Sequence, residues 1–301
     1  DDQFQKILEN PKVKEDKYSL KAISHLIMAI ANQHHRYSDF FGKLEKILLL
    51  LKDNIIQKLS NNEIFNIFKS NKRLLLFLIK EKFLSIDQTI VNTIQKEGFL
   101  AAKYQIFFFP EIKALMDSNL KNEILSKVQD LSSQNFGVFE HKRNIGENHE
   151  QICELIRKDS IDEFIAYLKK TNTPTSFKVP QSIFETNSFL LENDPTLIEY
   201  SAFFGSIQIF KYLQSNGAQL TPSLWLYAIH GNNLEILNLL KDSQIKPKDA
   251  TYNECLNESI KCHHNEITEF IQTNFIQNQN GGDFVNMSSA KYHNYALLSD
   301  N

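Results

Sequence analysis

The sequence predicts an all-α fold in which pairs of helices stack side by side as a solenoid. Composition points to helix, because glycine supplies only 9 of the 301 residues and proline only 7. A chain so poor in these turn formers lacks what many-turned β-sandwiches need. The second observation is a pattern of helix faces that recurs along the second half of the chain. Hydrophobic residues at 42% and charged residues at 23% are typical of a globular chain with a core.

The first half is predicted to hold helices in a less regular arrangement. Amphipathic stretches run over 18–31 and 40–59, and the motif from Ser60 to Glu63 matches a capping box before a further helix pair. The two faces of that pair, which begin 11 residues apart, are Ile64-Ile67-Phe68 and Leu75-Leu78-Ile79. A short helix is expected after Pro110, because proline is tolerated in the first turn of a helix.

Polar stretches mark the expected domain boundary and loops. The expected loops are 132–149, 171–180 and 277–286. The first of them separates the two predicted domains, an irregular helical region over 1–131 and a repeat domain over 150–301. A weaker helix pair over 152–165 opens the second domain, and a final capping helix is expected over 287–298.

Three copies of a helix pair are registered with one another in the second domain. In each copy, one face at positions i, i+3 and i+4 is followed 11 residues later by a second face of the same spacing. The first faces are Ile198-Ser201-Ala202, Trp225-Ala228-Ile229 and Leu256-Ser259-Ile260, and the second faces are Ile209-Tyr212-Leu213, Ile236-Leu239-Leu240 and Ile267-Phe270-Ile271. Because a single pair cannot bury these faces alone, the copies are expected to stack.

Turn formers lie between the helices of each pair. The turns are Gly205-Ser206, Gly231-Asn232-Asn233 and Cys262-His263-His264-Asn265. Gly and Asn tolerate a positive φ, and Ser or Asn can cap the next helix, so the third turn is chemically the poorest of the three. Gly205 is the expected structural turn residue, and Ala202 and Ala228 are small enough for close helix contact. Trp225 is expected in the core, because its helix is apolar all round.

The segment from Thr196 to Ala218 resembles a degenerate ankyrin repeat. It carries a Thr-Leu opening, a small pair, a glycine turn and a second helix closed by Gly-Ala. The clearest copies are 196–218, 223–248 and 254–276, and the longer string 180–231 is similar to an uncharacterised ankyrin-like domain family expanded in parasitic protists. The third copy lacks the opening Thr-Pro and the turn glycine, and the periods of 27 and 31 residues are shorter than usual. The resemblance implies an all-helical scaffold with an interaction role.

Four residues are the candidate partner-binding residues: Phe203, Phe204, His230 and Lys261. They follow the small residues near the end of the first helix in each copy, a stretch that faces the concave groove in the ankyrin arrangement. Aromatic, His and Lys side chains there can contact a protein partner. The alternative is that Phe204 packs under the next copy.

No catalytic residue, cofactor or metal is predicted. The only adjacent glycines, Gly281-Gly282, lie in a polar stretch, and no Ser or Cys occupies a glycine-flanked elbow. The best metal candidate is the set Cys255, Cys262, His263 and His264. On a helix the two cysteines are about 10 Å apart, too far for one zinc ion, so buried thiols beside a polar turn are expected instead. The pair His34-His35 is likewise expected to be a polar turn.

Charge and cysteine usage narrow the class of partner. The net charge is −3, divided as +3 over 1–150 and −6 over 151–301, without a clustered basic stripe for nucleic acid. The second half therefore favours a partly basic protein partner. Three cysteines are too few for a disulfide framework, and the longest apolar runs are far too short to span a bilayer.

The function predicted from these observations is a non-enzymatic protein–protein interaction scaffold in the cytoplasm. The alternative is a regulatory or host-directed module of a larger polypeptide, and a third, less favoured interpretation is a helical enzyme without a recognisable motif.

Overall fold

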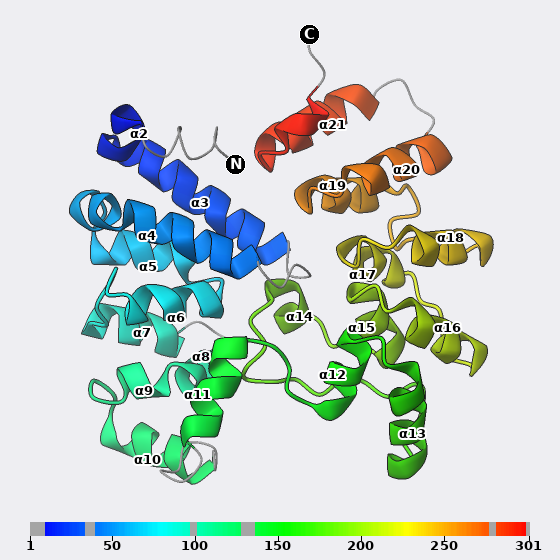
Figure 1. Cartoon of the computed structure of the whole chain (residues 1–301), viewed down its shortest axis with the longest axis horizontal. Helices are drawn as coiled ribbons and strands as arrows, with labels where there is room; N and C mark the ends of the chain where they lie inside the picture. The colour runs from blue at the N-terminus through cyan, green and yellow to red at the C-terminus, as the bar shows by residue number, and fades with distance from the viewer. Residues whose placement is uncertain (1–9, 34–39, 97–100, 128–135, 277–280, 299–301) are drawn as a thin grey trace. The chain divides into compact units, whose positions relative to one another are not determined.

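The computed structural model describes residues 10–33, 40–96, 101–127, 136–276 and 281–298 (Figure 1). Within these residues the fold is all-α, as predicted, and the only β-type pairing is an isolated bridge between Lys178 and Thr196. The chain forms two compact units. The first unit combines 1–149 with 181–192, and the second combines 150–180 with 193–301.

The unit boundaries differ from the predicted domains, 1–131 and 150–301. Residues 136–145, expected in a loop, form helix α11 (Phe136–Ile145) of the first unit, whereas 132–135 lie outside the described residues. This helix was hidden by its polar composition, but Phe139 and Arg143 are buried. Residues 181–192, expected within the repeat domain, also belong to the first unit.

The remaining helices of the first unit include the predicted stretches 18–31 and 40–59, the predicted pair after Ser60 and the short helix at Pro110, together with helices that were not predicted. They are α2 (Pro11–Glu15), α3 (Lys17–Gln33), α4 (Phe40–Lys58), α5 (Asn61–Phe68), α6 (Lys72–Lys80), α7 (Gln88–Lys96), α8 (Ala101–Phe107), α9 (Phe109–Ile112), α10 (Ser118–Lys127) and α14 (Ser188–Glu192). The predicted capping box is confirmed, since the Ser60 side chain accepts from the Glu63 N–H and the Glu63 carboxylate accepts from the Ser60 N–H. Pro110 lies in the first turn of α9.

A buried ion pair fixes α11 in the core of the first unit. The Arg143 guanidinium donates to both oxygens of the Glu111 carboxylate, at 2.7 and 2.8 Å, and to the Phe107 carbonyl at 2.8 Å. Arg143 also lies over the rings of Phe107 and Phe139. Because a buried guanidinium needs several acceptors, these contacts define where α8, α9 and α11 meet.

Residues 181–192 complete this core from a distant part of the chain. The Ile183 carbonyl accepts a 2.7 Å hydrogen bond from the buried Lys72 ammonium group, and the Thr186 hydroxyl donates to the Gly146 carbonyl at 2.7 Å. Phe184 is buried against the other aromatic side chains of the unit. These contacts explain why the segment groups with the first unit.

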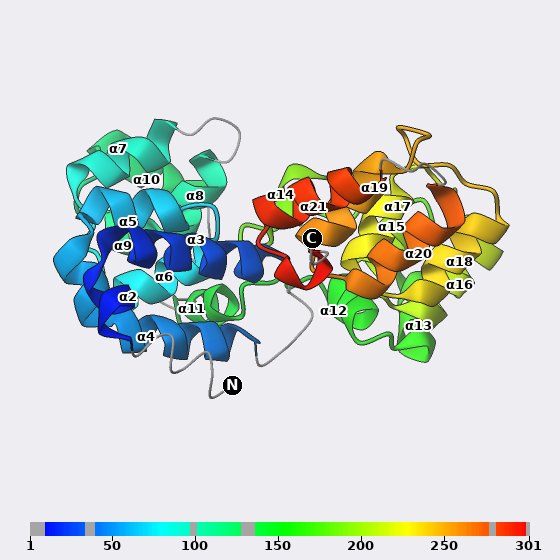
Figure 2. The same ribbon diagram turned by 90° about the horizontal axis from the view of Figure 1, so that it is seen from above.

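The second unit consists of helix pairs in chain order. Its helices are α12 (Gln151–Arg157), α13 (Ile161–Thr171), α15 (Leu197–Phe203), α16 (Ile207–Ser215), α17 (Leu224–His230), α18 (Leu234–Asp242), α19 (Asn253–Lys261), α20 (Asn265–Phe275), α21 (Gly281–Lys291) and the short 3-10 turn η3 (Tyr295–Leu297). Helices α12, α15, α17, α19 and α21 contact one another in succession and form what we term the first row (Figures 1 and 2). Helices α13, α16 and α18 form a second row in the same order, and each pairs with the first-row helix before it.

The predicted faces of the three copies lie in the core of the second unit. All nine residues of the first faces are buried, and so are Ile209, Ile236 and Ile267 of the second faces. The prediction of a loop over 277–286 is wrong for residues 281–286, because they form the beginning of α21. Residues 277–280 lie outside the described residues. The predicted capping helix over 287–298 ends at Lys291 and is followed by η3. The polar sequence before 287 concealed Val285, which packs inward.

All five first-row helices end in a similar left-handed turn, and four of these turns share one hydrogen bond. A left-handed residue follows each helix: Asp159 (φ 51°), Gly205 (φ 64°), Asn232 (φ 44°), His263 (φ 56°) and His293 (φ 58°). In four turns the next N–H donates to the carbonyl five residues earlier, from Ser160, Ser206, His264 and Asn294. This is the Schellman arrangement, which satisfies the last carbonyls of a helix. The expected positive φ is therefore found at Gly205 and Asn232, and the third copy places a histidine there.

Candidate interaction surface

The common turn places a set of side chains at one register position. Phe203, His230 and Lys261 each precede the left-handed residue by two positions. Arg157 and Lys291 occupy the same position in the first and last helices of the row, although no sequence argument singled them out. The shared turn could have revealed them, but Arg157 lies in a pair of different helix offset and Lys291 in a segment expected to follow a loop.

The structure separates the four predicted partner-binding residues into two groups. Phe203 and His230 are 0% and 1% exposed, so their expected exposure in a groove is wrong. Their rings stack on each other at 5.3 Å, because consecutive first-row helices approach closely enough to cover them. Phe204 is half-buried, with its ring 5.1 Å from that of Phe203, and the Lys261 side chain is 33% exposed. Only Phe204 and Lys261 can meet a partner directly.

A hydrogen-bonded network connects the buried His230 to α19. The His230 Nε2 atom lies 2.9 Å from Glu258 Oε1, and the Lys261 ammonium donates to both Glu258 oxygens at 2.9 and 3.2 Å. Burial alone would raise the pKa of the Glu258 carboxyl, but His230 and Lys261 outweigh it and lower that pKa to about 2. Burial opposes the charged form of Lys261 as well, yet Glu258 raises the pKa of its ammonium group. The network therefore holds Glu258 ionised.

Cys262 extends this network on the other side of the imidazole. Its Sγ atom lies 3.7 Å from His230 Nδ1, so cysteine, histidine and carboxylate follow one another in the order of a nucleophilic triad. The sulfur is fully buried, however, and burial raises the pKa of the Cys262 thiol well above its usual range. A protonated thiol without solvent access cannot attack a substrate, so the arrangement does not support cysteine catalysis.

The same three residues offer one possible set of metal ligands. One atom each of His230, Glu258 and Cys262 lies within 4.8 Å of the others. Glu258 faces Nε2 of the imidazole, whereas Cys262 faces Nδ1. One ion cannot bind both nitrogens of a single ring, so this geometry does not hold one ion between all three residues.

The two histidines of the predicted metal candidate are engaged in other contacts. The His264 Nδ1 atom donates to the Ile229 carbonyl at 2.8 Å, and the His263 Nε2 atom donates to the Tyr292 carbonyl at 2.9 Å. Cys255 is buried, and burial raises the pKa of its thiol. The histidines thus position the helix pairs relative to one another. The pair His34-His35 lies outside the described residues.

Hydrogen bonds from the turns link successive first-row helices. The Ser206 hydroxyl donates to the Ile156 carbonyl at 2.6 Å, as the His264 ring does to Ile229 and the Asn294 amide to Ile260 at 3.0 Å. Each acceptor lies three residues before the left-handed residue of the preceding turn. The contribution of His264 was not expected, because a histidine in a turn gives no sequence signal of the distant carbonyl that it contacts.

The residues expected to form the turn and core lie as follows. Gly205 is the left-handed turn residue, and Ala202, Ala228 and Trp225 are completely buried. The Trp225 indole donates to the Ile245 carbonyl at 2.7 Å, so its polar atom is satisfied within the core.

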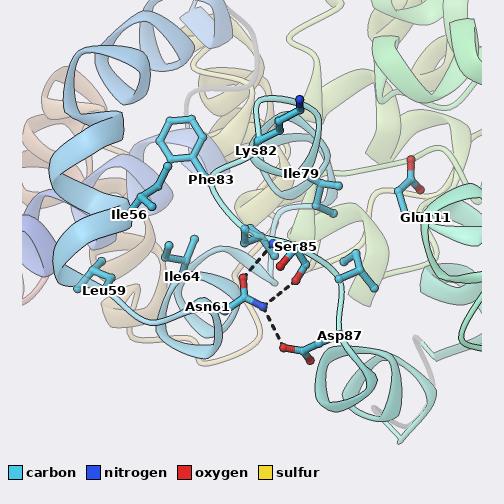
Figure 3. A pocket seen from close by; sticks show the side chains of 12 residues that line it. Ile56, Leu59, Asn61, Ile64, Ile79, Lys82, Phe83, Ser85, Asp87 and Glu111 are labelled. Carbon is cyan, nitrogen blue, oxygen red and sulfur yellow. Dashed lines mark hydrogen bonds between the residues drawn. The ribbon is translucent and has the colours of Figure 1, made fainter.

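The first unit has a separate groove between α4, α5 and the loop after α6 (Figure 3). Its volume is about 930 Å³, and its apolar lining includes Ile64 and Phe83. The Asn61 amide crosses one side of the groove, where it donates to the Ser85 carbonyl at 2.6 Å and to Asp87 at 3.0 Å (Figure 3). These polar groups are already paired, so the groove presents chiefly apolar surface.

Comparison with family models, curated proteins and solved structures finds no match to this chain. Among the described residues, no helix combines the length and the apolar character needed to cross a membrane.

Proposed function

We propose that the second unit is a non-enzymatic protein-interaction module of ankyrin-like helix pairs, which works in the cytoplasm. The observation that carries the proposal is the shared register at the ends of the first-row helices, where Arg157, Lys261 and Lys291 are accessible although Phe203 and His230 are buried at the same position. Repeated surfaces of this kind suit an extended partner segment. The three cysteines are buried and form no disulfide, in keeping with a reducing compartment.

The proposed contact surface consists of the accessible side chains at these helix ends. Its members are Arg157, Phe204, Lys261 and Lys291. Phe204 supplies an aromatic anchor, with the Arg157 guanidinium 6.0 Å from its ring, and Arg157 also donates to the Tyr200 hydroxyl at 3.0 Å. Aromatic and arginine side chains are frequent anchors at protein interfaces.

The local charges favour an acidic partner segment along this surface. Three of its four members are cations, which are also stabilised by the negative ends of their helices, although Glu258 already offsets the charge of Lys261. The basic partner expected from the net charge of the second half would instead meet acidic residues in the first turns of the second-row helices, such as Glu235 of α18. Because charges near a contact dominate its electrostatics, the charges at the helix ends outweigh the total charge.

The test begins with affinity purification and mass spectrometry from the source cell, followed by direct binding of the purified partner. Phe204→Ala and Lys261→Gln should each weaken binding about tenfold, as expected for loss of an anchor contact. Leu234→Ala is the matched control, because Leu234 is a 36% exposed apolar residue at the start of second-row helix α18.

Wild-type affinity in both first-row variants would overturn the proposed surface, provided that their melting temperatures equal that of the control. Turnover in a broad screen of hydrolase and transferase substrates would overturn the non-enzymatic assignment.

A further inference from the structure

Among the residues that the structure describes, helix α21 presents an exposed face at the end of the first row. Its exposed residues are Asp283, Phe284, Met287, Ala290 and Lys291, whereas Val285, Ser288 and Ser289 are buried. Since helical residues three and four apart share a face, the exposed residues form one continuous stripe. The methionine at its centre is 75% exposed, which is unusual for a large apolar side chain.

The position of Met287 is a contact position in two other first-row helices. It lies six residues before the left-handed residue of its turn, as Asn257 does in α19 and Glu199 in α15. The Glu199 carboxylate accepts from Thr221 and Ser223, which begin the next pair, at 3.1 and 2.5 Å. The Asn257 amide contacts Tyr292 at 3.2 Å in the next pair. On α21 the same position carries an apolar side chain, so a contact there would be apolar rather than hydrogen-bonded.

The stripe is complementary to itself in the antiparallel orientation. Met287 lies midway between Asp283 and Lys291, about 6 Å from each along the helix axis. If two such helices pair about a two-fold axis at Met287, the Asp283 carboxylate of each copy faces the Lys291 ammonium of the other. The same symmetry places the large Phe284 opposite the small Ala290. Both charge and size therefore match twice in one interface.

We propose that a second copy of this chain docks on α21, with the two α21 helices antiparallel across a two-fold axis. This self-association is independent of the partner surface proposed above. One face of an 11-residue helix is much smaller than the roughly 800 Å² per partner of a stable interface. The dimer is accordingly weak, with a Kd on the order of 100 μM.

Sedimentation equilibrium of the full chain tests the proposal between about 5 and 500 μM, a range that brackets the expected Kd. The wild-type protein should shift from monomer to dimer across this range, and Met287→Glu should remain monomeric. Asp283→Lys and Lys291→Asp should each remain monomeric too, because each places like charges opposite one another at both ends of the interface. An equimolar mixture of these two variants should associate, since every pair is then of opposite charge.

Controls separate this contact from unfolding and from general effects of charge. The substituted residues are exposed, so all variants should keep the wild-type melting temperature. Lys248→Asp, a charge reversal at an exposed lysine outside α21, should dimerise like the wild type. A wild-type chain that stays monomeric throughout would overturn the proposal. So would a Met287→Glu variant that associates normally, or a mixture of the two charge variants that fails to associate.

Discussion

The backbone of Gly231 lies so close to Ala202 that a Cβ atom on the glycine would overlap the Ala202 carbonyl oxygen. Gly231 caps α17, and Ala202 lies near the end of α15. In neighbouring turns the equivalent carbonyl receives a side chain, as Ile156 does from Ser206. Between α15 and α17 the two backbones meet directly instead. The glycine is therefore required for this approach, while the left-handed φ of its turn belongs to Asn232.

Gly231→Ala should lower the free energy of unfolding by about 2 kcal/mol, because the added methyl group forces α15 and α17 apart. Urea denaturation measures the change. Gly137→Ala is the control, since a Cβ atom there meets no atom within 4 Å in helix α11 and should leave stability unchanged or raise it slightly. Equal losses in the two variants would contradict the close approach.

Trp225→Ala should destabilise the protein by roughly 3–5 kcal/mol through loss of a large buried ring. The indole packs edge-on against Tyr252 and Phe275, at 5.1 and 5.3 Å between ring centroids. Trp225→Phe keeps a ring but loses the hydrogen bond to the Ile245 carbonyl, so a smaller loss is expected. Thermal melts distinguish them, and a shift in Tm no larger than that of a surface substitution would disprove the role of the indole.

Lys72 makes the stability of the first unit depend on pH in the alkaline range. Burial lowers the pKa of its ammonium group from 10.5 to about 7, although the charge of Glu185 opposes the shift. Between pH 7 and 10.5 the unfolded chain binds more protons at this site than the folded chain. Stability should therefore rise with pH across that window, by up to about 1.4 kcal/mol per pH unit.

Lys72→Met should remove this part of the pH dependence, because the methionine cannot titrate. Urea midpoints measured at intervals over the same pH window test the change in slope. The exposed Lys113 in the same unit offers a control, and Lys113→Met should keep the wild-type slope. A Lys72→Met variant with an unaltered slope would refute the argument.

Glu258 contributes stability that should disappear in acid. Its folded pKa of about 2 lies below the ordinary value of 4.5, so the contribution is present above pH 4.5 and is lost as the pH falls toward 2. Glu258→Gln should lower stability near neutral pH by up to about 3 kcal/mol and flatten the acid limb of the stability curve. Glu254→Gln changes an exposed carboxyl on the same helix and should preserve that limb; parallel acid limbs in wild type and Glu258→Gln would count against the network.

The helix pairs were predictable because their buried faces repeat locally. Each buried face can be recognised from five consecutive residues, and the faces begin at the buried residues Ile198, Trp225 and Leu256. The same periodicity could not decide whether His230 faces a groove or the next helix, since both orientations fit the same spacing of apolar residues. Its imidazole contacts Glu258, which lies 28 residues further along the chain. The ankyrin-like assignment and the interaction role stay predictions.

Contacts distant in sequence account for the boundary that was missed. The string from Pro180 onward carried part of the family resemblance, yet the Ile183 carbonyl is held by Lys72, 111 residues earlier. Nothing in the local pattern of either segment signals this pairing. Helix α11 was missed for a related reason, because Arg143 is a polar residue that becomes buried only with Glu111 beside it.

The insertion of 181–192 into the first unit has a consequence for biosynthesis. A chain emerging from the ribosome cannot complete the core around Lys72 until Ile183 has left the exit tunnel, and α12 and α13, which precede Ile183 in the sequence, emerge before it. Nascent chains halted before this point should therefore be sensitive to protease throughout the first unit, and those that expose residue 192 should become resistant. The order of translation and the order of structural completion thus differ in this protein.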